Sequence, residues 1–332
     1  MRKMASIRTI NKISPIMGAD NIVCARVDGW EVVIRKNEFN EGDLCVYCEI
    51  DSKLPKDNPS FAFLKSKKIK TIKLKGQISQ GICFPMTILP GGCYEVGQDV
   101  SEILGIEKYE TPLPAQLAGK IKGYFPGFIP RTDEERVQNI PHIIEEYAGT
   151  ILYITEKLDG SSITVYIKDG KFGVCSHNLE LKIDDPDNFR NTFFQTAIRL
   201  DLENKIKQLG FNVVLQGELV GPGIQKNVLA LKEHDIYFYN VFDIDTKRYL
   251  DKNDFVNTIR SLGLKTVPIL DNILLNHSVH NLVDMSFDRS KINPKVHREG
   301  IVLRPLNEMW IDGFGRFSFK VINPQYLLKY EE

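Results

Sequence analysis

A lysine followed two residues later by an aspartate and then a glycine lies between two apolar, strand-like runs. The run ILYIT precedes Glu156-Lys157-Leu158-Asp159-Gly160, and SITVYI follows it. Side chains two positions apart point to the same side of an extended chain, so this segment places the Lys157 amine beside the Asp159 carboxylate. An amine attacks only when neutral, and burial or neighbouring cations lower a lysine pKa. Alone, a KxDG tetrapeptide is typical of an ordinary hairpin turn.

Four further strand-like segments carry charged or aromatic residues at their ends. Glu218 lies in QGELVG after the apolar run NVVL, and Phe242 lies near the end of IYFYNVFDID. Glu299 begins EGIVLR, and Lys320 lies in FSFKVI. Each segment alone is a weak signal, because strand ends often carry solvated charges and strands often carry core aromatic residues. Their order along the chain makes them informative.

The series KxDG, GExxG, FDI, EGIVxR and FK resembles the motifs of the covalent nucleotidyltransferases, which include ATP-dependent DNA and RNA ligases and mRNA capping enzymes. The resemblance covers residues from about 130 to 325. It implies that Lys157 attacks the α-phosphate of ATP, and that Lys320 contacts this phosphate. It also implies that Asp159, Glu218 and Glu299 hold a divalent metal, mainly through water, and that Glu218 accepts hydrogen bonds from a ribose hydroxyl of the nucleotide. Carboxylates without His or Cys ligands suit Mg²⁺ or Mn²⁺ better than zinc.

Four more residues are candidate ATP contacts on this resemblance. Phe242 would stack on adenine, although it could be an ordinary core aromatic. Glu156 resembles the residue whose backbone recognises the adenine amino group, and its side chain could be only solvated. His177 stands where relatives commonly have Arg, so it is either a weak ribose or phosphate contact or a plain loop histidine. Arg136 either reaches the ATP phosphates or forms a salt bridge on a helix surface.

A second position, besides His177, departs from the family pattern. Relatives often have a second lysine two positions before Lys320, where this chain has Ser318. This puts a second phosphate contact in doubt, and Arg316 is the candidate to supply it.

The arrangement of the chain favours one branch of the superfamily. Only 12 residues follow Lys320, which leaves no room for the C-terminal barrel of DNA ligases and capping enzymes. Short β-type runs fill the first 105 residues or so instead, and several such runs predict a small barrel. The segments KGQISQGICFP and GFIPRTDEERVQN also look like parts of RNA ligases with an N-terminal OB-like domain. The implied fold is α+β: an OB-like β-barrel followed by an ATP-grasp-like adenylyltransferase domain of mixed antiparallel sheets with helices.

We expect an OB-like nucleic-acid-binding domain at 1–106, a Pro- and Gly-rich linker at 107–130 and the nucleotidyltransferase domain at 131–332. IVCARV and EVVIRK around Asp28-Gly29 predict a hairpin. Thr132 with Glu135 predicts a helix start, and Pro141 divides that stretch into two short helices. Helices are also expected in NTFFQTAIRLDLENKIKQLG and NDFVNTIRSLG.

The charge is balanced overall, with 43 basic and 43 acidic residues, which excludes a chain that is basic throughout. Six lysines nevertheless fall within residues 65–75, in a segment that reads as a strand with one basic face. Such a face could follow a phosphate backbone, or it could be an edge strand guarded by lysine. The candidate contacts to nucleic acid are Lys68, Lys70, Lys73 and Lys75. The aromatic residues that could stack on bases beside them are Phe61, Phe63, Tyr47 and Trp30.

These features predict an ATP-dependent RNA ligase that joins 3′-hydroxyl and 5′-phosphate ends of RNA through a lysyl-AMP intermediate and AMP-capped RNA. The partners would be ATP and RNA, in the form of a nicked duplex or broken strand, and the protein would be a monomer. Alternatives are a capping-type guanylyltransferase, a DNA ligase-like enzyme or a non-catalytic RNA-binding protein. No signal peptide or apolar run long enough to span a bilayer is apparent, so we expect a soluble intracellular protein.

Overall fold

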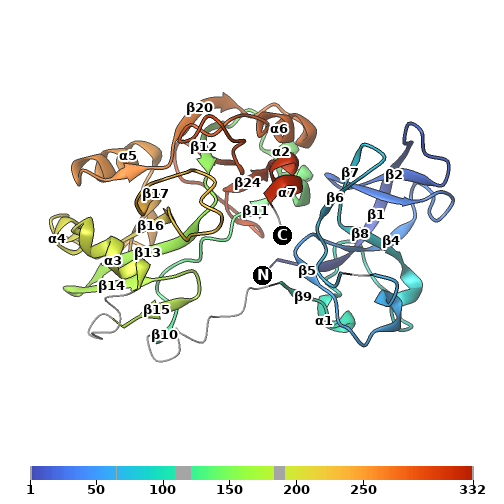
Figure 1. Ribbon diagram of the computed structural model, residues 1–332, viewed down its shortest axis with the longest axis horizontal. Coiled ribbons are helices and arrows are strands. Elements are labelled where there is room, and N and C mark those ends of the chain that lie inside the picture. Colours follow the sequence, from blue (N-terminus) through green and yellow to red (C-terminus); the bar gives the residue numbers. More distant parts are fainter. Residues whose placement is uncertain (1, 65, 110–120, 183–190, 331–332) are drawn as a thin grey trace.

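A computed structural model describes residues 2–64, 66–109, 121–182 and 191–330. The chain forms two β-rich parts that lie side by side, the first drawn in blue and the second in green to red (Figure 1). Their strands belong to separate sheets, and separate hydrophobic clusters lie beneath those sheets.

The first part is built on a five-stranded sheet in the order β3-β2-β1-β4-β8. All its neighbouring strands pair antiparallel, and the expected hairpin is present, with its turn at Asp28 and Gly29. Trp30, Phe61 and Ile7 are among the residues buried in its core. The strands are β1 (Ala5–Pro15), β2 (Ile22–Val27), β3 (Trp30–Arg35), β4 (Leu44–Cys48) and β8 (Ile82–Pro85).

Short elements complete this part. A separate hairpin joins β6 (Thr71–Leu74) to β7 (Gln77–Gln80), and β5 (Ser52–Lys53) pairs with β9 (Glu107–Lys108). The 3₁₀ turns η1 (Pro59–Phe61) and η2 (Met86–Ile88) and the one-turn helix α1 (Ser101–Leu104) lie between the strands.

The lysine-rich segment departs from the expected single strand. Its strand begins only at Thr71, so Lys68 and Lys70 precede β6, and Lys75 lies in the turn with φ 49°. Ile69 is buried, whereas Ile72 and Leu74 are exposed on β6. Because the segment changes direction at both ends of the strand, the four candidate lysines do not share one strand face. Lys65 lies outside the described residues.

The second part contains two sheets, one centred on β13 and β16 and the other on β12 and β21. The first has the order β10-β15-β14-β13-β16-β17-β18, with β19 also paired to β17. Its strands are β10 (Ile121–Tyr124), β13 (Ser161–Lys168), β14 (Lys171–Cys175), β15 (Leu179–Leu181), β16 (Val213–Val220), β17 (Asp235–Asp243), β18 (Arg248–Tyr249) and β19 (Lys265–Thr266).

The other sheet has the order β11-β24-β21-β12-β20. Its strands are β11 (Glu135–Arg136), β12 (Ile151–Lys157), β20 (Ile269–Leu274), β21 (Gly300–Pro305) and β24 (Phe319–Ile322). The small hairpin of β22 (Trp310–Ile311) and β23 (Gly315–Arg316) lies between β21 and β24 in the sequence.

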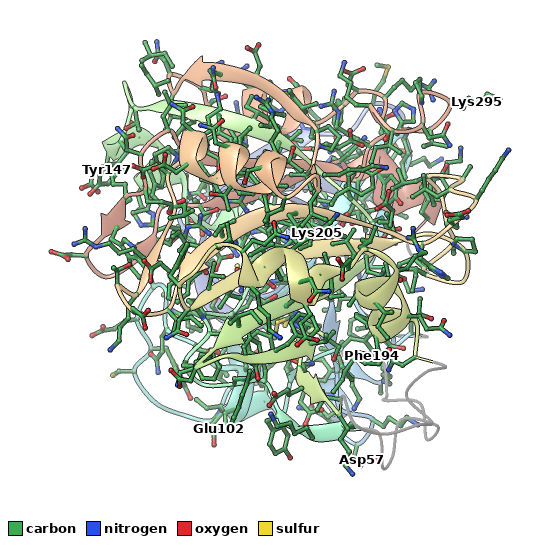
Figure 2. The ribbon with its side chains drawn as sticks, turned by 90° about the vertical axis from the view of Figure 1, so that its left-hand side faces the viewer. Asp57, Glu102, Tyr147, Phe194, Lys205 and Lys295 are labelled. Atoms are coloured by element: carbon green, nitrogen blue, oxygen red, sulfur yellow. The ribbon has the colours of Figure 1, made fainter. Side chains whose placement is uncertain are left out.

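Helices cover the outer side of the β13–β16 sheet (Figure 2). The expected helices form α3 (Thr192–Arg199), α4 (Leu202–Lys207) and α5 (Lys252–Ser261). The helical conformation is interrupted between α3 and α4 at Asp201, where φ is 54°. Asn191 caps α3 by accepting the Phe193 N–H. Phe194 packs inward into the sheet's hydrophobic cluster. The remaining helices are α2 (Pro141–Glu146), α6 (Val279–Met285) and α7 (Pro324–Tyr330).

The helix expected to start at Thr132 does not form. The chain is extended there, β11 follows, and a 3₁₀ turn, η4 (Val137–Asn139), leads into α2 with Pro141 in its first turn. The Glu135 carboxylate, read as part of a helix cap, accepts instead from the Arg136 N–H and the Asn139 amide. Parallel pairing of β11 with β24 overrides the local helical signal.

Within the described part of the chain, no helix is long and apolar enough to cross a membrane.

Candidate active site

The KxDG segment is the crossing point between the two sheets of the second part. Lys157 ends β12, and β13 begins at Ser161 in the other sheet, so residues 158–160 carry the chain across. Strand register then sets the neighbours, because Lys157 is opposite Gly300 on β21 and Ser162 is opposite Glu218 on β16. The sequence-distant carboxylates of Glu299 and Glu218 are thereby brought to the same end of the two sheets.

Gly160 is required by this crossing. A Cβ atom at Gly160 would lie 2.5 Å from the Leu219 carbonyl oxygen and 2.7 Å from the Glu218 Cγ. Only a residue without a side chain lets the turn approach β16 so closely. The glycine of the motif therefore fixes the separation between the lysine segment and Glu218.

Lys157 is held by carboxylates. Its Nζ donates to both oxygens of Glu299 at 2.7 Å. Burial favours the neutral amine, but the charges of Glu299 and Glu218 outweigh burial, so the pKa of Lys157 is raised. Burial in turn raises the pKa of Glu218 to about 8, and it also raises the pKa of Glu299. The ligand-free site therefore holds a protonated lysine among crowded acids.

Asp159 bonds to the last helix. Its Oδ2 accepts a hydrogen bond of 2.7 Å from the hydroxyl of Tyr326 on α7. Burial and the Asp159 charge raise the pKa of Tyr326, so its hydroxyl stays protonated and acts as the donor. No motif identified in the sequence includes Tyr326.

Lys320 approaches the site on β24, between β21 and β11. It is opposite Val302 on one side and Arg136 on the other. Burial, followed by the charges of Arg136, Arg2 and Lys157, lowers the pKa of Lys320 to about 7. Positive charges thus outweigh the nearby charge of Asp133 around this lysine, which suits a group that receives a phosphate.

Lys157, Glu218 and Lys320 meet at a cavity of about 200 Å³, whereas Asp159 and Glu299 do not line it. Apolar atoms from Leu158, Val267 and Val302 form part of its wall, together with the ring of Tyr239. The remaining lining residues are polar or charged: Thr132, Asp133, Glu134, Thr155, Glu156, Lys157, Ser162, His177, Glu218, Arg304 and Lys320. An apolar wall with convergent polar and charged groups is typical of a ligand site.

Sequence reasoning missed Tyr239, Glu134 and Arg304. Arg304 is buried, donates to Glu134 at 2.9 Å and to Ser318 at 3.0 Å, and lies over the Tyr239 ring. The arginine closing EGIVLR was a possible signal for this group. The sequence offers no signal for Tyr239, because it is one of several aromatic residues in the same strand.

Phe242 does not line this cavity. It is buried in a separate cluster with Val214 and Ile129 and packs edge-on against Tyr249. Tyr239 lines the cavity from the same strand. Tyr239 lies at a bulge in the pairing of β16 with β17, between Phe238 and Asn240, so simple alternation along the strand does not predict which face this ring takes.

Glu156 and His177 both line the cavity. The Glu156 side chain is buried rather than solvated, and its Oε2 accepts the Lys291 N–H at 2.8 Å. Burial raises the pKa of Glu156. The Nε2 of His177 lies 3.8 Å from an Asp133 oxygen.

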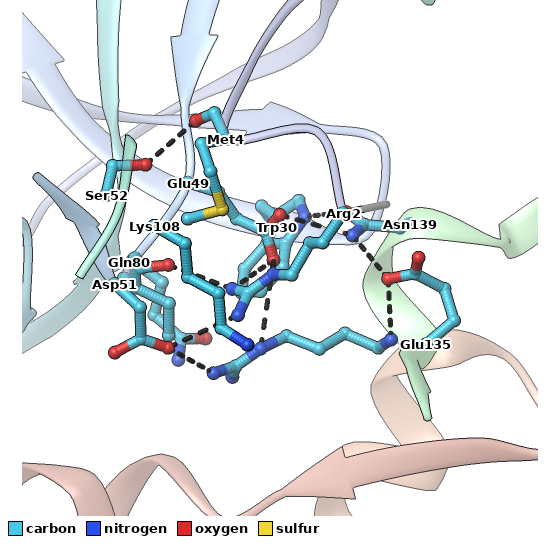
Figure 3. A network of polar contacts seen from close by, with 12 residues as sticks. Arg2, Met4, Trp30, Glu49, Asp51, Ser52, Gln80, Lys108, Glu135 and Asn139 are labelled. Carbon is cyan, nitrogen blue, oxygen red and sulfur yellow. Dashed lines mark hydrogen bonds and ion pairs between the residues drawn. The ribbon is translucent and has the colours of Figure 1, made fainter. Parts of the chain in front are cut away.

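Arg136 lies on neither a helix nor a solvated surface. It is buried on β11, donates to Asp51 of the first part at 2.9 Å and lies 3.7 Å from a Glu49 oxygen. Arg2 donates to the same two acids. Figure 3 shows Arg2, Glu49 and Asp51 gathered opposite Glu135 and Asn139 of the second part. The network joins the two parts beside Lys320.

A larger cleft of about 1590 Å³ shares Lys157, His177 and Lys320 with the cavity and extends between the two parts. Lys68 lines this cleft, where its amine lies 4.9 Å from the Tyr109 ring centroid and 3.9 Å from an Asp51 oxygen. Lys73 and Lys75 are exposed on the β6–β7 hairpin, and Lys70 is half-buried.

Most of the aromatic residues considered for stacking are in the core. Phe61, Tyr47 and Trp30 are buried, the last donating from its indole N–H to Asn139 at 2.7 Å. Phe63 is 66% exposed. The sequence of a small barrel does not determine whether each aromatic ring points into the core or toward solvent.

Arg316 is committed to other partners. It donates to Glu308 at 2.7 Å and to Asn240 at 3.0 Å, and it stacks 3.6 Å from the Tyr249 ring centroid. Ser318 is buried and accepts from Arg304. Neither residue is arranged as a spare phosphate contact.

The acids suit a hydrated divalent cation. Among the residues with described positions, no three His, Cys, Asp or Glu side chains are placed to hold a metal ion directly. Glu299, Glu218 and Asp159 nevertheless all act on the charge of Lys157. An oxygen-only set of crowded acids fits Mg²⁺ or Mn²⁺ that keeps its water shell, in keeping with the expected water-mediated site.

A lysine at the crossing of two mixed, mainly antiparallel sheets, surrounded by acids and preceded by an OB-type sheet, defines the class of covalent nucleotidyltransferases with an N-terminal OB fold. The OB-fold domain family matches residues 4–86, and the RNA ligase family matches residues 150–322. The chain belongs to the RNA ligase family.

Solved structures of an RNA ligase from Naegleria gruberi are similar to the whole chain. Its apo mutant is 41% identical, with a TM-score of 0.91 over 99% of this chain and 98% of that one. The complex with pyrophosphate is 41% identical, with a TM-score of 0.90 over 99% of both chains. A mutant with ATP and Mn is also 41% identical, with a TM-score of 0.90 over 98% of both. No curated protein matches the chain. The predicted family and fold class are confirmed.

Proposed function

We propose that the protein is an ATP-dependent RNA ligase that seals a 3′-hydroxyl to a 5′-phosphate in nicked or broken RNA. The observation that carries this proposal is the convergence of Lys157, Glu218 and Lys320 on one cavity, with Glu299 bonded to the lysine. Membership of the RNA ligase family supports RNA as the substrate. The relative's complexes with ATP or AMP and Mn support ATP as the AMP donor and a divalent metal as its companion.

In the first step, the neutral Lys157 amine attacks the α-phosphorus of ATP. A P–N bond forms, the P–O bond to pyrophosphate breaks, and lysyl-AMP remains. Since Glu299 and Glu218 keep Lys157 protonated in the free protein, the amine must lose its proton before attack. A divalent cation, when bound, neutralises the nearby acids and the phosphate charge. Lys320 faces the charge that develops on the α-phosphate.

The apolar wall of the cavity would receive adenine. We propose that Tyr239, rather than Phe242, lies against the base, because Tyr239 lines the cavity and Phe242 is in the core. Arg304, which donates to Glu134, lies over the Tyr239 ring. Glu156 and His177 remain candidates for contacts to adenine and to ribose or phosphate, respectively.

In the second and third steps, AMP passes to the RNA 5′-phosphate as a 5′–5′ pyrophosphate linkage, and the 3′-hydroxyl then displaces AMP. The interdomain cleft brings RNA to the amine, and Arg2, Lys68, Lys108 and Arg131 on its walls attract the phosphates. Lys70, Lys73 and Lys75 would extend this attraction over the hairpin. We propose a nicked duplex as the substrate and a monomer as the active unit.

We also propose the division into an OB-like domain at 1–106, a linker at 107–130 and an adenylyltransferase domain at 131–332. Pairing of β9 with β5 ties the start of the linker to the first domain, and pairing of β10 with β15 ties a later part to the second. Residues 110–120 of the linker lie outside the described residues.

The proposal is tested by incubating the protein with ATP or GTP labelled in the α-phosphate and a divalent metal. ATP should label the wild-type protein and the control Lys171→Ala, whose lysine is exposed on β14, but not Lys157→Ala. Label on Lys157→Ala would refute the nucleophile. Preference for GTP would favour a capping-type transferase, and no label on any variant would favour a non-catalytic RNA-binding protein.

The substrate is tested on matched nicked duplexes with RNA or DNA on each side of the nick. Sealing should require RNA at one or both ends. Equal sealing of all-DNA nicks would favour a DNA ligase-like enzyme.

A further inference from the structure

The last helix, α7, makes a direct contact with the KxDG motif. Tyr326, in the middle of this helix, is 5% exposed and donates its hydroxyl to Asp159 Oδ2 at 2.7 Å. The ring packs 4.6 Å from that of Tyr330, one turn further on. A buried tyrosine whose hydroxyl ends on a carboxylate fixes the direction of that carboxylate.

The first turn of α7 is attached to the segment that carries Glu299. The Asn323 N–H donates to the Glu299 carbonyl oxygen at 2.8 Å, and the Asn323 amide donates to the Arg298 carbonyl at 3.2 Å. Asn323 is fully buried. The helix therefore cannot shift without disturbing the backbone beside the acid that holds Lys157.

The other face of α7 contacts the first domain. Leu327, the residue after Tyr326, packs against the hydrophobic core of the OB-like domain, and α7 lies against β6. In Figure 1, α7 lies on the side of the second domain that faces the first. The same short helix thus touches the OB-like domain through one residue and Asp159 through its neighbour.

We propose that Tyr326 is a positioning residue that aims the Asp159 carboxylate at the divalent cation, and that contact of Leu327 with the OB-like domain sets the position of Tyr326. Asp159 has two carboxylate oxygens. The Tyr326 hydroxyl donates to Oδ2, which restrains the side chain, and Oδ1 would remain to hold the cation through water. Metal binding at Asp159 is thereby linked to the seating of the OB-like domain.

Removing an outer partner of a metal-binding group typically lowers metal affinity by about 10- to 100-fold. Because Asp159 acts through water, we expect the lower end of that range for Tyr326→Phe. The change deletes one oxygen and keeps the buried ring. Tyr330→Phe is the matched control, since it makes the same change one turn further along α7, where the tyrosine is stacked on Tyr326.

The inference rests on the proposed function, so the test separates metal binding from chemistry. Mn²⁺ binding to the full chain is measured by electron paramagnetic resonance in the presence of an ATP analogue with a non-cleavable α–β bridge. Tyr326→Phe should bind Mn²⁺ about 10-fold more weakly than the wild type, and Tyr330→Phe should match the wild type. Equal affinity in Tyr326→Phe and the wild type would overturn the positioning role.

A second variant tests the link to the OB-like domain without touching the hydroxyl. Leu327→Ala should weaken Mn²⁺ binding severalfold, and its effect should largely vanish when Tyr326→Phe is already present, because both act through one hydrogen bond. Fully additive effects, or wild-type affinity in Leu327→Ala, would overturn the link. Absence of an AMP adduct in the wild type would refute the proposed function, whereas the Mn²⁺ measurements judge the Tyr326 inference separately.

Discussion

The Nζ of Lys157 lies 2.7 Å from each of the two carboxylate oxygens of Glu299, so the proposed nucleophile and an acid on the neighbouring strand form one close ion pair. β12 and β21 impose this contact, since Lys157 is paired with Gly300 in the antiparallel register. The pair raises the pKa of the amine. In the free protein the Lys157 amine is therefore protonated, and it stays so until a cation competes for the Glu299 carboxylate.

The rate of adduct formation should rise with pH, because only the neutral amine of Lys157 attacks. In single-turnover assays with saturating ATP, the logarithm of the rate should increase between about pH 6 and pH 9. Higher Mn²⁺ should move the profile to lower pH, because neutralised acids no longer hold the proton. A profile that is flat at every metal concentration would contradict the protonated resting state.

Lys320 should take up a proton when a phosphate binds. Its pKa is lowered to about 7, below the ordinary value of 10.5, so near pH 8 it is mostly neutral in the free protein. An adjacent anion favours the charged form and raises the pKa again. Calorimetry of AMP binding at pH 8, in buffers of different ionisation enthalpy, should show net proton uptake that falls in Lys320→Met. The same uptake in both proteins would exclude Lys320 as the group that titrates.

Glu218 should make the ligand-free protein less stable as the pH rises. Its folded pKa is about 8 against an ordinary value of 4.5, so the folded state binds more protons than the unfolded state between these values. The free energy of unfolding then falls through this window, by an amount on the order of a few kcal/mol at most. Urea unfolding at pH 5 and pH 8 without metal should show a smaller difference for Glu218→Gln than for the wild type. If the difference in unfolding free energy between pH 5 and pH 8 is the same in Glu218→Gln and the wild type, a group other than Glu218 causes the pH dependence.

The ion pair between Arg136 and Asp51 should contribute to the seating of the two domains. The Arg136 side chain is 7% exposed, and neutralising Asp51 removes the acid that lies 2.9 Å from this buried charge. Asp51→Asn should lower the free energy of unfolding by about 1–3 kcal/mol, which is less than the loss expected when a buried charge is left entirely unpaired. The double variant Asp51→Asn with Arg136→Met should lose less unfolding free energy than the sum of the losses in the two single variants. Losses that simply add would argue against direct coupling between the two residues.

Gly160→Ala should disrupt the site by forcing the KxDG turn away from β16. The added Cβ would meet the Leu219 carbonyl oxygen at 2.5 Å, and backbone cannot move aside as a flexible side chain can. We expect a loss of about 1–3 kcal/mol in stability and a larger loss of adduct formation. Gly123→Ala is the control, because a Cβ there meets nothing within 4 Å. Wild-type labelling by Gly160→Ala would show that the close approach is dispensable.

The sequence alone determined the kind of chemistry and the order of the parts that carry it. A lysine in KxDG and the acids and lysine of the later motifs must lie near strand ends, because each sits at the edge of an apolar run whose length suits a strand. The short β-type runs before residue 105 likewise determined an OB-type domain at the amino end, which the comparison with known families confirms.

The tertiary structure decided which side chains meet. Strand register brought Lys157 beside Glu299, and the position of Tyr239 along β17 placed its ring, rather than that of Phe242, at the cavity. Parallel pairing of β11 put Arg136 in a strand instead of the expected helix. Tyr326 reached Asp159 across 167 positions of sequence. Such contacts depend on how separate sheets and helices pack together, and a pattern of neighbouring residues carries no information on contacts made between distant segments.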